Sequence, residues 1–298
     1  MVKSKRLKQC GKRGEKVFSW FSMAPSLIGV LTFFILPFCI VVYYSLIENP
    51  ISKGFVFLDN YTKIIKNNEA FKIAVRNTAM FSVIAVPLAI ILSLGLAVLL
   101  NSKIPAKSLF RAFFLCPLMV PTASVVLIWQ VMFHAHGTIN ELSARFGAEP
   151  IDWIKSPYSH VIIVTMFLWK NLGYNMILFM AALGNIPKDI LEVADLEGAS
   201  AWYKFIHIKL RYLSPTIFFV LLLSLINSFK IFREVYLLTG SYPYDKLYLV
   251  QHFMNNTFAS LDYQKLSTAA VLFALAMVVI IGLLFICEKK FGEDVENS

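Results

Sequence analysis

Charged residues are scarce in this chain of 298 residues, because Asp, Glu, Lys and Arg together make up only 15% of it. In a soluble globular domain about a quarter of the residues are charged and about half are apolar. Here 58% of the residues are hydrophobic, and the mean hydropathy is +0.67. This composition excludes an ordinary soluble protein and predicts a chain whose helices face lipid.

The chain also lacks the short motifs of several enzyme classes. It has no G-x-x-x-x-G-K-S/T segment, so we expect no phosphate-binding P-loop, and H-E-x-x-H, C-x-x-C and G-x-S-x-G are absent too. The 4 cysteines are scattered, and His134 and His136 have no third metal ligand nearby in the sequence. We therefore expect no catalytic activity, metal ion or cofactor on this chain.

Apolar residues are gathered in long blocks, and a helix of about 20 such residues can cross a bilayer. Six blocks are expected to form spanning helices: Pro25–Ile47, Thr78–Leu100, Ala112–Phe133, Val161–Leu183, Pro215–Asn227 with a short extension at either end, and Leu266–Ile286. Prolines inside the blocks, among them Pro117 and Pro121, predict kinks. The predicted fold class is an all-α membrane protein with six transmembrane helices.

A net charge of +10 would also suit a nucleic-acid-binding protein, but the basic residues do not form one patch. They gather in the first tail, residues 1–23, and in loops beside the apolar blocks, notably at 101–111. Basic residues mark the cytoplasmic side of a membrane protein. We therefore expect one transmembrane domain over 24–287, cytoplasmic tails at 1–23 and 288–298, contact with membrane lipid, and no nucleic-acid partner.

The connection at residues 184–214, here called the elbow loop, is too polar to span a membrane and is patterned as two short helices. Pro187 suits a first helical turn, Gly198 ends that helix by adopting a positive φ, and Ser200 can cap the next helix. The first helix has an acidic face, formed by Asp189, Glu192 and Asp195. The second helix has an apolar stripe of Trp202, Phe205 and Ile206 beside a basic stripe of Lys204, His207 and Arg211. This pattern fits an amphipathic hairpin on the lipid surface and a docking element for a cytoplasmic partner equally well.

The elbow loop resembles a known motif. The order Glu192-Val-Ala194, Gly198, Ile208 and Leu210 is similar to the EAA loop of permease subunits in binding-protein-dependent ABC importers, and the flanking residues resemble the maltose-type first permease of carbohydrate uptake. Further matching residues are spread along the chain: Asp59-Asn60-Tyr61, Asn77-Thr78, Arg111, Pro117, Pro121, Trp129, Gly137, Asn140, Trp169-Lys170, Gly173, Phe232 and Thr239-Gly240. Val193, Glu197 and Arg211 depart from the pattern, and Arg211 stands where the family usually has proline.

The resemblance implies a permease subunit of an ATP-driven carbohydrate importer in a bacterial cytoplasmic membrane. Its partners would be a second, homologous permease, an extracellular sugar-binding protein and two ABC ATPase subunits, which would hold ATP and Mg²⁺. The elbow loop would be cytoplasmic and would couple the permease to an ATPase. The expected coupling residues are Glu192, Ala194, Glu197, Gly198, Ala199 and Phe205.

A sugar pathway needs polar groups for hydroxyls and flat apolar faces for the rings. The candidates are Trp129, Trp169, Lys170, Asn171, Tyr174, Asn175 and Asn227, most of them within the fourth apolar block. Lys170 is costly inside a membrane, which makes it a functional candidate. The alternative is that Lys170 bonds a neighbouring helix or extends to the membrane surface.

Two other classes of protein remain alternatives on composition alone. A secondary transporter driven by an ion gradient would be expected to show inverted repeats and paired broken helices, and we detect neither in the sequence. A membrane-embedded enzyme would need acidic residues or histidines clustered within the spans, which contain almost none. The EAA-like pattern favours the importer subunit over both.

Overall fold

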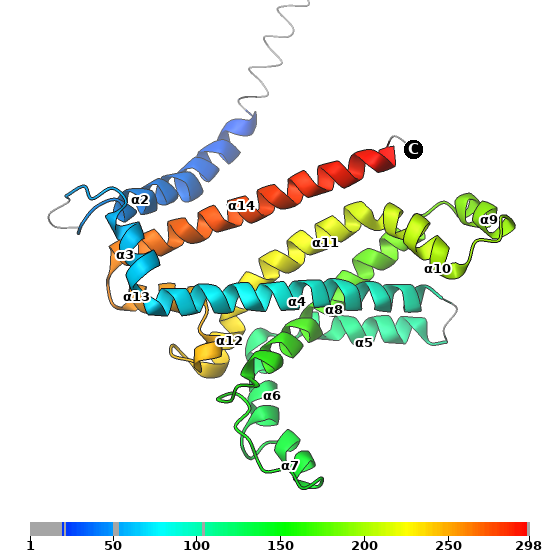
Figure 1. Ribbon diagram of the computed structural model, residues 1–298, viewed down its shortest axis with the longest axis horizontal. Helices are drawn as coiled ribbons and strands as arrows, with labels where there is room; N and C mark the ends of the chain where they lie inside the picture. Colours follow the sequence, from blue (N-terminus) through cyan, green and yellow to red (C-terminus); the bar gives the residue numbers. More distant parts are fainter. Residues whose placement is uncertain (1–19, 21, 50–53, 103–104, 297–298) are drawn as a thin grey trace, which may run out of the picture. The chain divides into compact units, whose positions relative to one another are not determined.

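The computed structural model describes residues 20, 22–49, 54–102 and 105–296, with side chains as far as residue 289. Most of the expected basic tail at 1–23 and part of the tail at 288–298 lie outside this description. The chain divides into two compact units, one formed by residues 1–67 and 260–274 and the other by 68–259 and 275–298. The described residues are largely helical (Figure 1).

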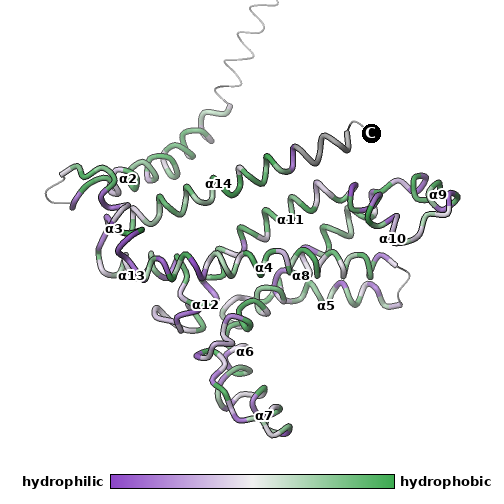
Figure 2. The backbone as a smooth tube through the Cα atoms, in the orientation of Figure 1, coloured by the Kyte–Doolittle hydropathy of each residue, from purple (hydrophilic) through white to green (hydrophobic). Residues whose placement is uncertain are grey.

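Within the described residues, five helices are long and apolar enough to cross a membrane: Ser22–Ser45, Glu69–Asn101 (α4), Ser159–Gly184 (α8), Ala201–Thr239 and Tyr263–Lys289. The first of these contains a π-helical stretch, Leu31–Ile35 (η1), followed by Leu36–Ser45 (α2). The last is part of α14, Tyr263–Glu296. Hydrophobic colour covers α2 and most of α4 in Figure 2. These helices confirm the all-α membrane fold class.

The third expected span is not one straight helix. It consists of α5 (Lys107–Met119) and α6 (Thr122–Phe133), and the helical axis bends by 99° between Lys107–Met119 and Thr122–Ala144, a segment that also includes α7 (Thr138–Ala144). The bend falls at Val120 and Pro121, both of which have extended backbone. A residue before proline is driven out of the α region by contact with the ring, which explains the break. The chain therefore has up to six spans among its described residues if this bent pair is one of them.

The fifth expected span also differs from its prediction, because the helix begins at Ala201 rather than near Pro215. Helix α10 (Ala201–Tyr203), the π-helical turn η2 (Lys204–Lys209) and α11 (Leu210–Lys230) follow one another without a loop. Pro215 lies inside α11, and α12 (Phe232–Thr239) follows directly after Ile231. The second half of the elbow loop is therefore continuous with the fifth span.

The core of the second unit lies between α4, α8, α5 and α11. Every fourth residue of one face of α4 is small and fully buried: Ala85, Ala89, Ser93 and Ala97. Small side chains let helices approach closely, which is the main way in which helices associate in a bilayer. Larger groups fill the spaces between the helices, as where the Phe81 and Phe167 rings meet edge to face at 5.5 Å.

The contact between α5 and α8 depends on a glycine. A methyl group at Gly173 of α8 would lie 1.9 Å from the backbone oxygen of Phe114, on α5. Gly173→Ala is therefore expected to push the two helices apart and to lower thermal stability and folded yield in detergent, both measured by fluorescence-detected gel filtration. Gly184→Ala in the same helix is the control, since nothing lies within 4 Å of its added methyl group. Equal stability of the two variants would contradict this close approach.

Several residues that carry the family resemblance anchor loops. The buried Asn140 side chain donates to the carbonyls of His134, Ala135 and Ile151 at 3.1, 2.9 and 2.7 Å, and it accepts from Trp153 Nε1 at 2.8 Å. Asn140 thus ties α7 to the segment that precedes α8. Each of these bonds replaces water around a backbone group in an irregular loop.

A second anchor holds the segment after α12 against α4. The Asn77 side chain donates to the carbonyls of Asp245 and Tyr248 at 2.5 and 3.0 Å, and Thr78 Oγ1 accepts from the Val250 backbone at 3.0 Å. These bonds position the short 3-10 helix η3 (Asp245–Leu247) and α13 (Val250–Ala259).

In the first unit, α3 (Asp59–Asn67) is held against the end of α2. Asn60 donates to the carbonyls of Ser45 and Ile47 at 3.0 and 2.9 Å, and the Tyr61 hydroxyl lies 2.7 Å from Ser45 Oγ. A single antiparallel bridge joins Ile47 and Phe55. These residues, too, belong to a resemblance motif, Asp59-Asn60-Tyr61, and their role here is structural.

Candidate functional site

The elbow loop turns at Gly198 by a complete helix-ending motif. Helix α9 (Lys188–Leu196) ends where Gly198 adopts a φ of +78°, and the Gly198 and Ala199 amides donate to Asp195 and Ala194 at 3.1 and 2.9 Å. This pair of bonds defines the Schellman motif, which requires a residue with positive φ. Ser200 Oγ then accepts from the Tyr203 amide at 3.1 Å and caps α10. The structure confirms the helix–glycine–helix prediction and the roles of Gly198 and Ser200, whereas Pro187 lies at the N-cap, directly before the first turn of α9.

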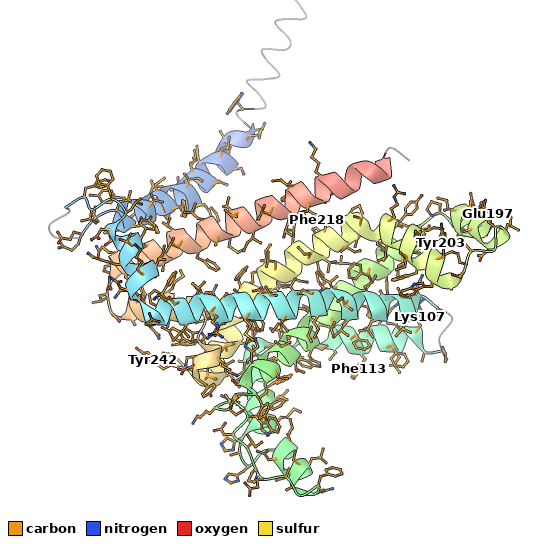
Figure 3. All side chains as sticks on the ribbon, in the orientation of Figure 1. Lys107, Phe113, Glu197, Tyr203, Phe218 and Tyr242 are labelled. Carbon is orange, nitrogen blue, oxygen red and sulfur yellow. The ribbon has the colours of Figure 1, made fainter. Side chains whose placement is uncertain are left out.

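The two arms of the elbow loop are joined by an ion pair between Lys204 and Asp195. These residues were predicted to lie on separate basic and acidic faces, and their contact was not predicted. Because Asp195 is paired inside the loop, the acidic groups that remain for a partner are those of Asp189 and Glu192 in α9 and of Glu197 directly after it. In Figure 3, Glu197 is labelled at the far end of the loop, with Tyr203 on the second arm.

The outer surface of the elbow loop combines exposed apolar and acidic side chains. Leu196 is 89% exposed and Trp202 is 72% exposed, while Glu192, Val193 and Glu197 are exposed beside them. Of the other expected coupling residues, Ala194 is the buried residue of α9 and Ala199 is half-buried. Phe205 is half-buried too, and its ring lies 5.9 Å from that of Trp202. Large exposed apolar side chains with a charged rim are typical of a protein-binding surface.

A cavity of about 500 Å³ lies in the second unit where α8, α11 and α12 meet. It is lined by Leu118, Phe167, Lys170, Asn171, Asn227, Lys230, Ile231, Phe232, Arg233, Glu234 and Gln251. Three of the expected pathway residues are thus brought together, namely Lys170, Asn171 and Asn227. The other four, Trp129, Trp169, Tyr174 and Asn175, are described by the structure but do not line this cavity.

The side chain of Lys170 forms an ion pair with Glu234, which is only 4% exposed and lies on α12. Lys170 therefore bonds a neighbouring helix, as one of the two sequence-based interpretations expected, and it also faces the cavity. Glu234 was not among the residues predicted for this site. Its position directly after Arg233, at the start of an otherwise apolar helix, was the available indication that a buried partner for a membrane lysine lay there.

Amide side chains form the polar part of the cavity wall. Asn227 donates to Asn171 Oδ1 at 3.0 Å, and Asn171 donates to the Phe167 carbonyl at 2.8 Å. Asn175 lies one turn away and donates to Ser224 Oγ at 2.9 Å in the buried interface between α8 and α11. Asn171 and Asn227 are therefore placed to meet a ligand, whereas Asn175 holds the helices together.

The expected aromatic residues lie apart from these amides. Trp129 is almost fully buried and stacks on Phe133 with ring centroids 5.1 Å apart, so it belongs to the hydrophobic core. The Trp169 and Tyr174 side chains are each 37% exposed on α8. The apolar residues that line the cavity are instead Leu118, Phe167, Ile231 and Phe232.

His252 of α13 borders this region without adding charge to it. Its ring contacts the Phe232 ring at a centroid distance of 4.7 Å, and its Nδ1 accepts from the Leu249 amide at 3.2 Å. Burial lowers the pKa of His252 to about 4, so the ring is neutral at pH 7. The charge of the cavity wall is therefore set by its lysine, arginine and glutamate side chains.

The helical fold, its bent third span and the glycine-ended elbow loop define a multi-pass membrane permease. The family model for the binding-protein-dependent transport system inner membrane component matches residues 85–291. The chain belongs to this family, whose members are transporter subunits of the cytoplasmic membrane.

Known proteins similar to this chain support that assignment. It is 32% identical to the trehalose/maltose transport system permease protein MalF of Thermococcus litoralis over 78% of this chain and 80% of the relative. It is 29% identical to the lactose transport system permease protein LacF of Rhizobium radiobacter over 94% and 96% of the two chains.

The fold is also that of a solved structure. A chain from the crystal structure of a bacterial ABC transporter that imports the acidic polysaccharide alginate superposes with a TM-score of 0.80 and 18% identity, covering 96% of this chain and 99% of that chain. At this identity the likeness concerns the fold alone.

Proposed function

We propose that this chain is the permease subunit of an ATP-driven importer that moves a carbohydrate from an external binding protein into the cell. The observation that carries the proposal is the combination of the family match with an intact elbow loop, which exposes the large apolar side chains Leu196 and Trp202 beside acidic groups. Carbohydrate as the cargo rests on the relatives, which are named for trehalose, maltose and lactose transport.

The proposed complex contains a second, homologous permease and two ABC ATPase subunits. Helix α9 would dock into one ATPase through its acidic and apolar surface, with Glu192, Glu197 and Leu196 at the contact. ATP and Mg²⁺ would be bound by the ATPases, and this chain would bind neither. Movement of the elbow loop would reach the spans directly, because its second arm is continuous with α11.

The proposed orientation places both termini and the elbow loop in the cytoplasm. The basic residues beside the apolar blocks support it. Segments near Asn60, Gly147 and Tyr244 would then face the outside, where the binding protein delivers its sugar. The sugar would pass the cavity lined by Lys170, Asn171 and Asn227.

Reconstitution of the whole importer in liposomes tests this function against an ion-gradient mechanism. With the binding protein outside and ATP inside, radiolabelled saccharide is expected to accumulate, and a non-hydrolysable ATP analogue should prevent accumulation. Ionophores that collapse proton and sodium gradients should leave uptake unchanged. Uptake that persists without ATP and stops when the gradients collapse would establish the secondary-transport alternative instead.

A further inference from the structure

The wall of the cavity carries an excess of positive charge. Lys170, Lys230 and Arg233 line it together with one carboxylate, Glu234. Because Lys170 is paired with Glu234, two cations remain beyond charge balance. A neutral saccharide needs no net charge at its binding site. Lys230 is exposed and the Arg233 side chain is 69% exposed, so both charges are accessible to a ligand that enters the cavity.

Within the described part of the chain, Lys230 has no acidic partner, and Arg233 shares its only acidic neighbour, Glu234, with Lys170. Lys230 ends α11 with its side chain exposed, and no described residue forms an ion pair or hydrogen bond with it. Arg233 Nη2 donates to Thr122 Oγ1 at 2.6 Å and lies 3.8 Å from Glu234 Oε1. The Thr122 bond fixes one edge of the guanidinium, and the rest of its planar set of N–H donors is left for a further acceptor.

The remaining lining suits a saccharide with an anionic group. Gln251, Asn171 and Asn227 present amides that bind hydroxyls, and Phe167 and Phe232 supply apolar surface for a ring. A cavity of about 500 Å³ falls within the usual range for small-molecule sites. Arginine recognises carboxylate, sulfonate and phosphate oxygens with paired N–H bonds, and lysine adds a point charge.

We propose that this cavity selects an acidic saccharide, whose anionic group is bound by Lys230 and Arg233 while Asn171, Asn227 and Gln251 bind its hydroxyls. The proposal rests on the proposed importer function and names the substrate class of its pathway. Alternatively, Lys230 and Arg233 could bind acidic groups of the second permease. In that case, removal of the two charges would disrupt assembly of the complex and not ligand binding.

The test is equilibrium binding of matched probes to the whole importer in lipid nanodiscs, without the binding protein, so that only the membrane complex selects. Digalacturonate is compared with neutral galactobiose, and glucose 6-phosphate with glucose. Each acidic probe is expected to bind at least about tenfold more tightly than its neutral counterpart, with affinity falling as salt is raised. The stronger of the two acidic probes identifies carboxylate or phosphate as the group recognised.

Lys230→Gln and Arg233→Gln are each expected to weaken binding of the acidic probe by about tenfold and to leave neutral-probe binding unchanged. Arg233→Lys should retain part of the affinity, and Lys155→Gln, outside the cavity, should retain all of it. Equal binding of acidic and neutral probes, or loss of the second permease from the Lys230→Gln and Arg233→Gln complexes, would overturn the proposal. If ATP drives liposome uptake of a neutral saccharide alone, the preference for acidic saccharides is overturned but the importer function stands. If ATP drives uptake of no saccharide, the importer function itself is refuted.

Discussion

Gly198→Val is expected to uncouple ATP hydrolysis from transport while the chain still inserts and pairs with its sister permease. Gly198 has a φ of +78°, and nothing lies within 4 Å of a methyl group added there. Loss of space is therefore not the problem. A β-branched residue in this backbone conformation costs about 1–3 kcal/mol, enough to open the Schellman turn. Opening it would move α9, with Glu192 and Leu196, out of register with the second arm.

The measurement is ATPase activity of the reconstituted complex with and without sugar-loaded binding protein. We expect stimulation to be lost in Gly198→Val and largely kept in Gly198→Asn, since asparagine tolerates the left-handed region better than other side chains. Probe binding in the cavity should be the same in both variants. Normal stimulation and uptake with valine would show that the elbow loop is only a surface hairpin.

The elbow loop could be predicted from sequence because its determinants are local. Gly198 and Ser200 act on backbone groups within a few residues, so a capping pattern is enough to place them. The break at Pro121 also has a local cause, since a residue before proline favours extended backbone. The sequence therefore indicated a disturbance there, but only a simple kink was predicted. The short helix after Ser200 was predicted, but its continuity with the fifth span was not, because Lys204, His207 and Lys209 make that segment too polar to be assigned to a span.

The cavity could not be assembled from sequence, because its walls come from distant parts of the chain. Lys170 and Glu234 are separated by 64 positions, and nothing in either apolar block states which faces meet. The polar residues of the fourth span were recognised, yet only the packing of α8 against α11 decides that Asn171 faces the cavity and Asn175 the helix interface. The position of the Arg233 side chain could not be predicted either, because it is fixed by a hydrogen bond to Thr122, which belongs to the bent third span.

The Lys170–Glu234 pair is the feature whose disruption should cost the most stability. Glu234 is buried, so removal of Lys170 leaves its carboxylate with only the more distant and largely exposed Arg233 as a counter-ion, 3.8 Å away. Breaking a buried pair destabilises by about 3–5 kcal/mol. We therefore expect Lys170→Met and Glu234→Gln each to lower the folded yield and thermal stability of the complex sharply. The exposed pair between Lys72 and Glu69 provides the control, because Lys72→Met should change stability by less than about 1 kcal/mol.

The double variant Lys170→Met/Glu234→Gln separates stability from transport. It removes both charges together, so no unpaired group stays buried, and thermal stability should return most of the way to the wild-type value. Uptake by the restabilised complex then shows what the ion pair does in the pathway. Full uptake would show that the pair is purely structural. Loss of uptake with stability restored would indicate that Lys170 contacts the substrate. A Lys170→Met single variant as stable as the wild type would contradict the buried pairing, because an abandoned Glu234 carboxylate in that position must be costly.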